Sequence, residues 1–227
     1  MEIGLKPSLF PPSLFRKTGI ALVLSILLFG APLRADDTAS AASADKANHN
    51  EVYAGFAYGK TKMTSHHKIT KGPKLDNEDN GHMFFIGREL GDGWSAEGFY
   101  ADLGEVKWSG KAGDKYSIGS VNYNVLLDTN ITTTGQSYGI AGKYSWDVGR
   151  NTRLYAKLGM HSWEIKSRVT YSGGSRSRTT DGTDAVGGLG IEYAVSDQIS
   201  IIAGSDNYVF DDDDVSLSYV GLRFGFN

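Results

Sequence analysis

Apolar and polar residues alternate with a period of two along most of the chain from residue 51 onward. The last such segment is the clearest, because apolar residues there are separated by Gly221, Arg223 and Gly225. A period of two places successive side chains on opposite faces of a β-strand. Segments with this pattern predict eight strands, at about 51–63, 82–90, 94–105, 136–147, 152–165, 184–195, 198–208 and 215–226.

The connections between these strands alternate between short and long. The tight turns are 91–93, 147–151 and 196–197, and the long polar connections are 64–81, 106–135 and 166–183. The remaining connection, Asp211 to Asp214, is short. Short turns at one end and long loops at the other are typical of a bacterial outer-membrane barrel. This layout places both termini at the short-turn, periplasmic end.

Five strands pair an apolar face with a face of glycine, alanine and ionisable residues. The ionisable residues on that second face include Lys143, Lys157, Glu192 and Arg223. A membrane barrel shows its apolar face to lipid and keeps polar or small residues inside. The alternative is a soluble periplasmic barrel or sandwich, whose buried side could not hold these charges without partners. Three strands leave their faces open, because Phe84 and Phe85 are adjacent and Phe99 and Ile202 would point inward. The pattern predicts an all-β, eight-stranded antiparallel up-and-down transmembrane β-barrel.

Aromatic residues gather near the expected strand ends, as an interfacial belt requires. The expected periplasmic girdle contains Trp94, Tyr144, Trp146, Phe224 and Phe226. Trp108 and Trp163 are expected at or above the outer rim, and we count Trp163 with Trp94, Tyr144 and Trp146 in the aromatic girdle.

The first 35 residues have a different pattern. A basic stretch precedes the apolar run 19–30, and Leu33 and Ala35 suit the -3 and -1 positions of a signal-peptidase site. An apolar core of about a dozen residues fits a secretory signal peptide better than an uncleaved anchor helix. We expect residues 1–35 to be a cleaved signal peptide, 36–50 a disordered periplasmic leader and 51–227 the barrel domain.

Composition narrows the functional classes. The chain has 227 residues, 29 glycines, no cysteine and a formal charge of -3. An acidic exported chain is a poor candidate for nucleic-acid binding. The absence of cysteine excludes a disulfide-stapled domain and an N-terminal lipoprotein anchor.

Four short motifs resemble the OmpA-type eight-stranded transmembrane domain and its single-domain relatives, the outer membrane protein β-barrel domain family. The motifs are 94–104 (WSAEGFYADLG), 155–160 (YAKLGM), 187–194 (GGLGIEYA) and 220–225 (VGLRFG). The resemblance covers about residues 51–227. It implies the fold rather than a specific activity.

The resemblance also implies that acidic and basic side chains pair inside the barrel and plug it. The matching residues are Glu97, Glu192, Lys143 and Lys157, and Arg223 lies on the same face. One basic position of the family pattern falls on Ile202, so the full network cannot be present. We expect Glu192 and Lys143 to form a desolvated pair whose one-sided disruption costs roughly 3–5 kcal/mol. The alternative is that each charge reaches solvent separately.

The family's barrels end in an aromatic residue that the barrel assembly machinery reads. The corresponding assembly signal here is Val220, Leu222, Phe224 and Phe226. Phe226 is penultimate, with Asn227 last, so the match is incomplete. Longer family members carry a periplasmic peptidoglycan-binding domain, and wall tethering is not implied for a chain that stops at the eighth strand.

Two candidate metal sites are less well supported by the sequence than ordinary solvated loops. His66-His67 lacks the further ligands of a zinc site, and Asp211 to Asp214 lacks the spacing and glycine of a calcium loop. We therefore expect no metal and no cofactor. The basic segment 172–178 (SGGSRSR) suits a contact with lipopolysaccharide phosphates.

Catalysis is also a weaker interpretation. His161 is the histidine placed on a strand near the outer rim, and the adjacent Ser162 must point to the opposite face. Ser137 or Asp206 could reach His161, but no motif supports either. We expect no enzymatic activity, with a lipid A-modifying enzyme as the least favoured alternative.

The sequence therefore favours an outer-membrane barrel with a structural and surface-interaction role. We expect contacts with outer-membrane lipid, lipopolysaccharide and the assembly machinery, and adhesin-like binding of a host, phage or matrix ligand through the three long loops. The second hypothesis is a small pore or ligand channel.

Overall fold

The computed structural model describes residues 52–64, 72–118, 121–211 and 213–226. The strands are β1 (Val52–Thr64), β2 (Lys74–Asp76), β3 (Glu78–Gly91), β4 (Trp94–Gly110), β5 (Lys115–Ile118), β6 (Val121–Asn124), β7 (Thr129–Asp147), β8 (Thr152–Tyr171), β9 (Gly174–Ala194), β10 (Ile199–Phe210) and β11 (Asp213–Phe226). The expected signal peptide, the leader and His66-His67 lie outside the described residues. In the part that is described, no helix is long and apolar enough to cross a membrane.

Eight antiparallel strands form a closed barrel. They follow the order β4, β3, β1, β11, β10, β9, β8 and β7, and pairing of β4 with β7 closes the ring. The first and last strands pair along their length, from Val52 with Phe226 to Thr64 with Asp214. Closure gives the edge amides of the ring a partner, as a sheet in hydrocarbon requires. The predicted fold class is confirmed.

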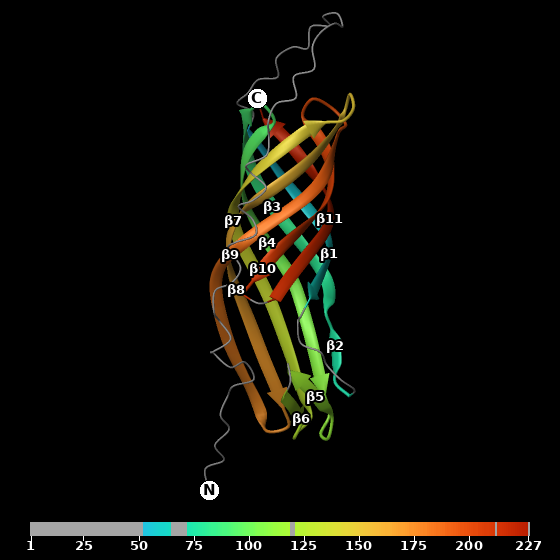
Figure 1. The fold of residues 1–227 in the computed structure, drawn as a ribbon, viewed down its shortest axis with the longest axis vertical. Coiled ribbons are helices and arrows are strands. Elements are labelled where there is room, and N and C mark those ends of the chain that lie inside the picture. Colours follow the sequence, from blue (N-terminus) through green and yellow to red (C-terminus); the bar gives the residue numbers. More distant parts are fainter. Residues whose placement is uncertain (1–51, 65–71, 119–120, 212, 227) are drawn as a thin grey trace, which may run out of the picture. The chain divides into compact units, whose positions relative to one another are not determined.

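Two of the expected long loops are largely strand. β8 and β9 continue through 166–183 and meet at a short turn, and the segment 106–135 contains the ends of β4 and β7 and the hairpin of β5 and β6. β2 pairs with β4 in the same region. Figure 1 shows β2, β5 and β6 at the end of the molecule away from the C-terminus. We call the paired residues 105–110, 129–134, 166–171 and 174–179 the extension, and its end of the barrel the far end.

The strand faces separate apolar surface from interior. Phe84 is 52% exposed, whereas the adjacent Phe85 is 7% exposed and points inward. Phe99 and Ile202 are also buried, which settles the strands that the sequence pattern left open. Small residues on the inner face make room for large ones. A Cβ at Gly87 would overlap the ring of Tyr53, and one at Gly190 would overlap the ring of Tyr155.

Aromatic residues mark both boundaries of the apolar outer surface. Trp94 and Trp146 are exposed and contact Tyr144, with ring centroids 4.9 Å apart in each case. A second set of exposed aromatics ends the apolar surface toward the far end, just before polar residues take over. This set, which the sequence analysis missed, is Tyr58, Tyr100 and Tyr138.

The placement of Trp163 in the aromatic girdle was wrong. Its side chain is 3% exposed and packs inside the barrel against Phe210, with ring centroids 5.3 Å apart. The indole N–H donates a 2.8 Å hydrogen bond to Asp184 Oδ2. Trp163 shares the parity of Tyr155 and Lys157 along β8, and both of those side chains point inward.

Candidate functional site

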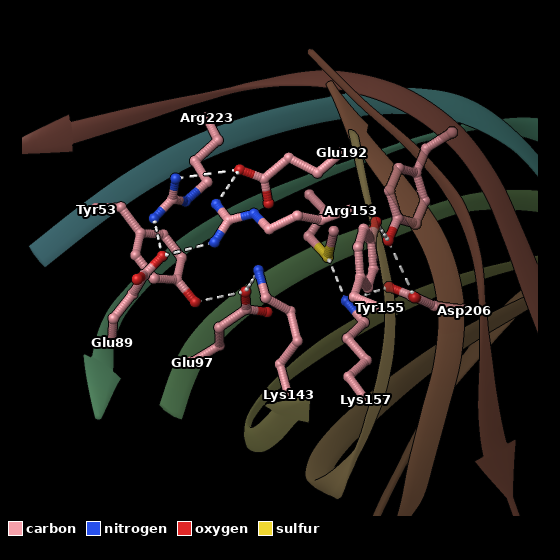
Figure 2. A network of polar contacts seen from close by, with 12 residues as sticks. Tyr53, Glu89, Glu97, Lys143, Arg153, Tyr155, Lys157, Glu192, Asp206 and Arg223 are labelled. Atoms are coloured by element: carbon pink, nitrogen blue, oxygen red, sulfur yellow. Dashed lines mark hydrogen bonds and ion pairs between the residues drawn. The ribbon is translucent and has the colours of Figure 1, made fainter. Parts of the chain in front are cut away.

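A network of four charged side chains fills the end of the interior where the chain's described termini lie. Glu192 on β9 accepts from Arg153 Nη2 at 2.9 Å and from Arg223 Nη1 at 3.1 Å. Arg223 Nη2 also contacts Glu89 Oε1 at 2.7 Å, and Arg153 Nη1 contacts the same oxygen at 3.4 Å. Figure 2 shows the two guanidinium groups between the two carboxylates. Four different strands (β3, β8, β9 and β11) are therefore joined across the interior.

A second ion pair lies deeper in the barrel. Lys143 Nζ lies 2.8 Å from Glu97 Oε1, and both side chains are buried. The Tyr53 hydroxyl donates to the same carboxylate oxygen at 2.8 Å. The expected pairing of Lys143 with Glu192 is therefore incorrect. Lys143 on β7 pairs in register with Ser95 on β4. Glu97 lies two residues further along β4 and on the same face as Ser95, so it is close to Lys143.

The third ion pair joins Lys157 and Asp206. Lys157 Nζ lies 2.6 Å from Asp206 Oδ2, and Tyr219 donates to Asp206 Oδ1 at 3.2 Å. Asp206 was not among the residues expected in the interior network. Its position four residues after Ile202 on β10 gives it the same inward parity, so the pattern contained the signal.

The ion-paired side chains of the interior are balanced in charge. Among the described residues these contacts join four carboxylates and four basic groups, namely Glu89, Glu97, Glu192 and Asp206 with Lys143, Arg153, Lys157 and Arg223. The cavity that adjoins Lys143 and Lys157 has a volume of about 10 Å³, which is room for a single water molecule.

An aromatic cluster fills the interior toward the far end. The His161 ring lies 5.4 Å from Phe210 and 5.5 Å from Tyr208, and Trp163 also contacts Phe210. His161 Nε2 lies 3.0 Å from the Val209 carbonyl, which can only accept, so Nε2 carries the proton. Ser137 therefore donates to His161 Nδ1 over 2.8 Å.

The candidate catalytic partners of His161 take separate places. Ser137 reaches His161, but both side chains are buried and pack within the aromatic cluster. Ser162 points to the other face and contacts Thr183 at 3.2 Å. Asp206 pairs with Lys157 instead. This arrangement stabilises the interior and offers the serine no exposed face.

The structure describes only part of the two candidate metal sites. In the described ranges, no group of three or more His, Cys, Asp or Glu side chains is arranged to hold an ion. Beside the turn between β10 and β11, Asp214 Oδ1 on β11 accepts from Asn207 on β10 over 3.3 Å. The histidine pair His66-His67 lies outside the described residues.

The extension presents a mixed apolar and basic inner face. Register pairs align Leu75, Trp108, Ile131, Val169 and Arg176 in one row across five strands. The next row toward the barrel contains Val106, Thr133, Ser167 and Arg178. At the tip, Tyr116 stacks on Tyr123 at 5.3 Å, and Trp108 lies 5.7 Å from Tyr116. Leu126 and Leu127 are 79% and 51% exposed.

One edge of the extension is held by an aspartate. Asp79 Oδ2 accepts from the backbone N–H of Glu105 at 2.7 Å, where the pairing of β3 with β4 has ended. Backbone donation from Asn80 and Glu105 lowers the pKa of the Asp79 carboxyl. The ionised aspartate therefore replaces a strand partner at this edge.

A closed sheet with an apolar outer surface, aromatic boundaries and charged residues inside defines a membrane β-barrel. The model of the outer membrane protein beta-barrel domain family matches residues 38–226, and the chain belongs to this family. It is accordingly an outer-membrane protein.

Two solved structures of other proteins are similar to the chain. The attachment invasion locus protein Ail of Yersinia pestis, in complex with the heparin analogue sucrose octasulfate, has a TM-score of 0.51 at 17% sequence identity, over 79% of this chain and 100% of that chain. The N-terminal barrel domain of Pseudomonas aeruginosa OprF has a TM-score of 0.47 at 17% identity, over 78% of this chain and 98% of that domain. No curated protein sequence matches the chain.

Proposed function

We propose that the protein is a surface-binding barrel that presents the extension outside the cell, with both termini in the periplasm. The observation that carries the proposal is the continuation of four strands beyond the ring as an ordered, paired sheet. Such a sheet adds nothing to the membrane-spanning part, and its tip exposes Tyr123, Leu126 and Leu127. Exposed apolar residues grouped on an ordered surface are typical of interaction sites.

The chemistry of the extension supports an adhesin-like role. Aromatic and aliphatic side chains on its inner face supply contact area, and arginines at the β9 edge supply charge. Ail, which shares the fold, binds a heparin analogue, so heparin is a suitable first probe. Lipopolysaccharide around the barrel is a second anionic contact for the basic end of the β8–β9 hairpin.

The alternative of a small pore has less support. A pore needs a continuous water path, whereas the interior contains the ion pairs and the aromatic cluster described above. The Ser137–His161 contact is the remaining argument for an enzyme, and its burial favours a structural role.

The orientation can be tested with single cysteines, because the natural chain has none. We expect an impermeant maleimide to label Ser172→Cys, at the tip of the β8–β9 hairpin, in intact cells. Val148→Cys, in the exposed turn between β7 and β8, is the matched control and should react only after the outer membrane is opened. The reverse labelling pattern would overturn the proposal.

The binding role can be tested by adherence to matrix-coated and heparin-coated surfaces. Bacteria that display the protein should adhere, and Leu126→Ser/Leu127→Ser should weaken adherence without changing the amount of folded barrel. Val148→Ser removes an exposed apolar residue at the opposite end and is the control. Equal adherence of cells with and without the barrel would contradict the proposed role.

A further inference from the structure

The β9 strand has one paired edge and one open edge over its first half. Residues 174–185 pair with β8, whereas the pairing of β9 with β10 begins only at Val186, opposite Tyr208. Within the described part of the chain, residues 175–183 have no strand on their second side. Every residue from Gly174 to Thr179 is exposed. An open edge of this kind presents backbone N–H and C=O groups that can pair with another strand.

The opposite edge of the extension is closed by the chain itself. β2 pairs with β4 from Lys74–Ser109 to Asp76–Lys107, and Asp79 binds the N–H of Glu105. The two edges of the extension therefore differ in their backbone pairing. Pairing on the β4 side is already satisfied, and the β9 side remains available.

Side chains at the open edge define what can be added there. Arg176 and Arg178 lie on the inner face, at the ends of the two rows that begin with Leu75 and Val106. Among the described residues, neither arginine forms an ion pair, in contrast to Lys166, which contacts Glu164 at 2.8 Å. A strand added beside β9 would place every second side chain on this inner face, next to the arginines.

We propose that the open edge of β9 binds an extended polypeptide segment of a partner protein as an additional strand. The arginines select segments with acidic side chains at alternate positions. Backbone hydrogen bonds supply the pairing, and charge supplies the selection, because like charges directly opposite one another destabilise a strand pair. The inference deepens the proposed surface role and rests on the extension being outside the cell. The β9 edge is a binding surface separate from the apolar tip at Leu126 and Leu127.

The test uses the full-length protein refolded in detergent and a fluorescent synthetic peptide in which aspartate alternates with threonine. A peptide of the same composition with its aspartates grouped together tests the alternate spacing. Two further peptides are N-methylated at alternate residues, one on the aspartates and one on the threonines. Successive N–H groups of a strand point to opposite edges, so only one of these two peptides lacks the N–H groups that would face β9.

We expect fluorescence anisotropy to show binding of the alternating peptide and of one N-methylated form, with the other form at least about tenfold weaker. Hydrogen exchange should show protection of amides within 175–183 on binding. Arg176→Thr/Arg178→Thr should weaken binding by at least about tenfold. Arg168→Thr removes a charge from the opposite face of the same hairpin and should change binding less than about twofold.

Three outcomes would overturn the proposal. They are the absence of binding by any peptide, equal binding of both N-methylated forms, and equal binding of the grouped and alternating peptides. If both N-methylated peptides bind equally and heparin displaces them equally, the arginines bind polyanions instead of an added strand. Adherence of cells that persists after Arg176→Thr/Arg178→Thr, with peptide binding lost, would leave the surface role intact, so the two proposals fail separately.

Discussion

Lys157 and Asp206 lie 2.6 Å apart between Nζ and Oδ2, on strands that are not neighbours in the barrel. The two side chains are 5% and 0% exposed, so water solvates neither charge appreciably. The pair therefore depends on its geometry and on the Tyr219 hydroxyl that also binds Asp206. It joins β8 to β10, the two strands on either side of β9, through the interior.

Removing one partner of this pair should destabilise the barrel strongly. Lys157→Met leaves the Asp206 carboxylate buried without its cation, and we expect a loss of about 3–5 kcal/mol in the free energy of unfolding. The measurement is the urea unfolding midpoint of the refolded protein in detergent. Lys157→Met/Asp206→Leu, which removes both charges, should recover most of the loss. An unchanged midpoint for the single variant would show that the pair contributes nothing.

The interior should conduct ions only when both of its filled regions are opened. Trp163→Ala/Phe210→Ala opens the far-end aromatic cluster, and Glu97→Ala/Lys143→Ala opens the middle of the charged network. We expect each double variant to remain as silent as the natural barrel in planar bilayers, and the quadruple variant to show discrete openings. Stable openings of the natural barrel would contradict this expectation and favour the pore hypothesis.

The tryptophans should differ in their contact with lipid. Trp94 and Trp146 lie on the exposed outer surface and Trp163 lies inside, so brominated lipids should quench the first two and leave the third nearly unchanged. Single-tryptophan variants, with the others replaced by phenylalanine, allow each to be measured in proteoliposomes. Strong quenching of Trp163 would restore it to the girdle that the sequence suggested.

The β4 edge of the extension should loosen in acid. The pKa of Asp79 is lower in the folded protein than in the unfolded chain, so its contribution is complete above the ordinary aspartate pKa of about 3.9. The contribution is lost as the pH falls through the lower, folded value. Hydrogen-exchange protection of the Glu105 amide, relative to the intrinsic rate, should fall over that range.

Asp79→Ala should show the same loss of protection already at neutral pH, because it removes the acceptor. Asp76→Ala removes a nearby exposed carboxylate on β2 and serves as the control for charge. Equal protection in the two variants would show that the aspartate does not hold this edge.

The alternation of apolar residues was enough to predict the barrel, because a closed sheet imposes one period on every strand. Lys143, Lys157, Glu192 and Arg223 were placed on the inner face for the same reason. Their partners were harder to predict, since which charges meet depends on strand register and on which strands lie opposite. The resemblance supplied a pairing rule, and the structure replaces Glu192 with Glu97 beside Lys143.

The alternation of apolar and polar residues did not reveal that the extension is β-sheet. Its strands have polar residues on at least one face and solvent on both sides, so no hydrophobic period marks them. The signal that remained was β-propensity, in runs such as Ile131-Thr132-Thr133-Thr134 and Val169-Thr170-Tyr171. Trp163 was misplaced for a related reason, because an aromatic residue near a strand end was assigned to lipid before its parity along β8 was considered.

The filled interior allows the barrel to carry the extension without also acting as a pore. A barrel without a water path can be produced in many copies without admitting small toxic molecules across the outer membrane. Selection can then vary the exposed sheet for new ligands while the ion pairs beneath it stay fixed. Under the proposed function, the barrel anchors a recognition surface while ion pairs and aromatic rings fill its interior.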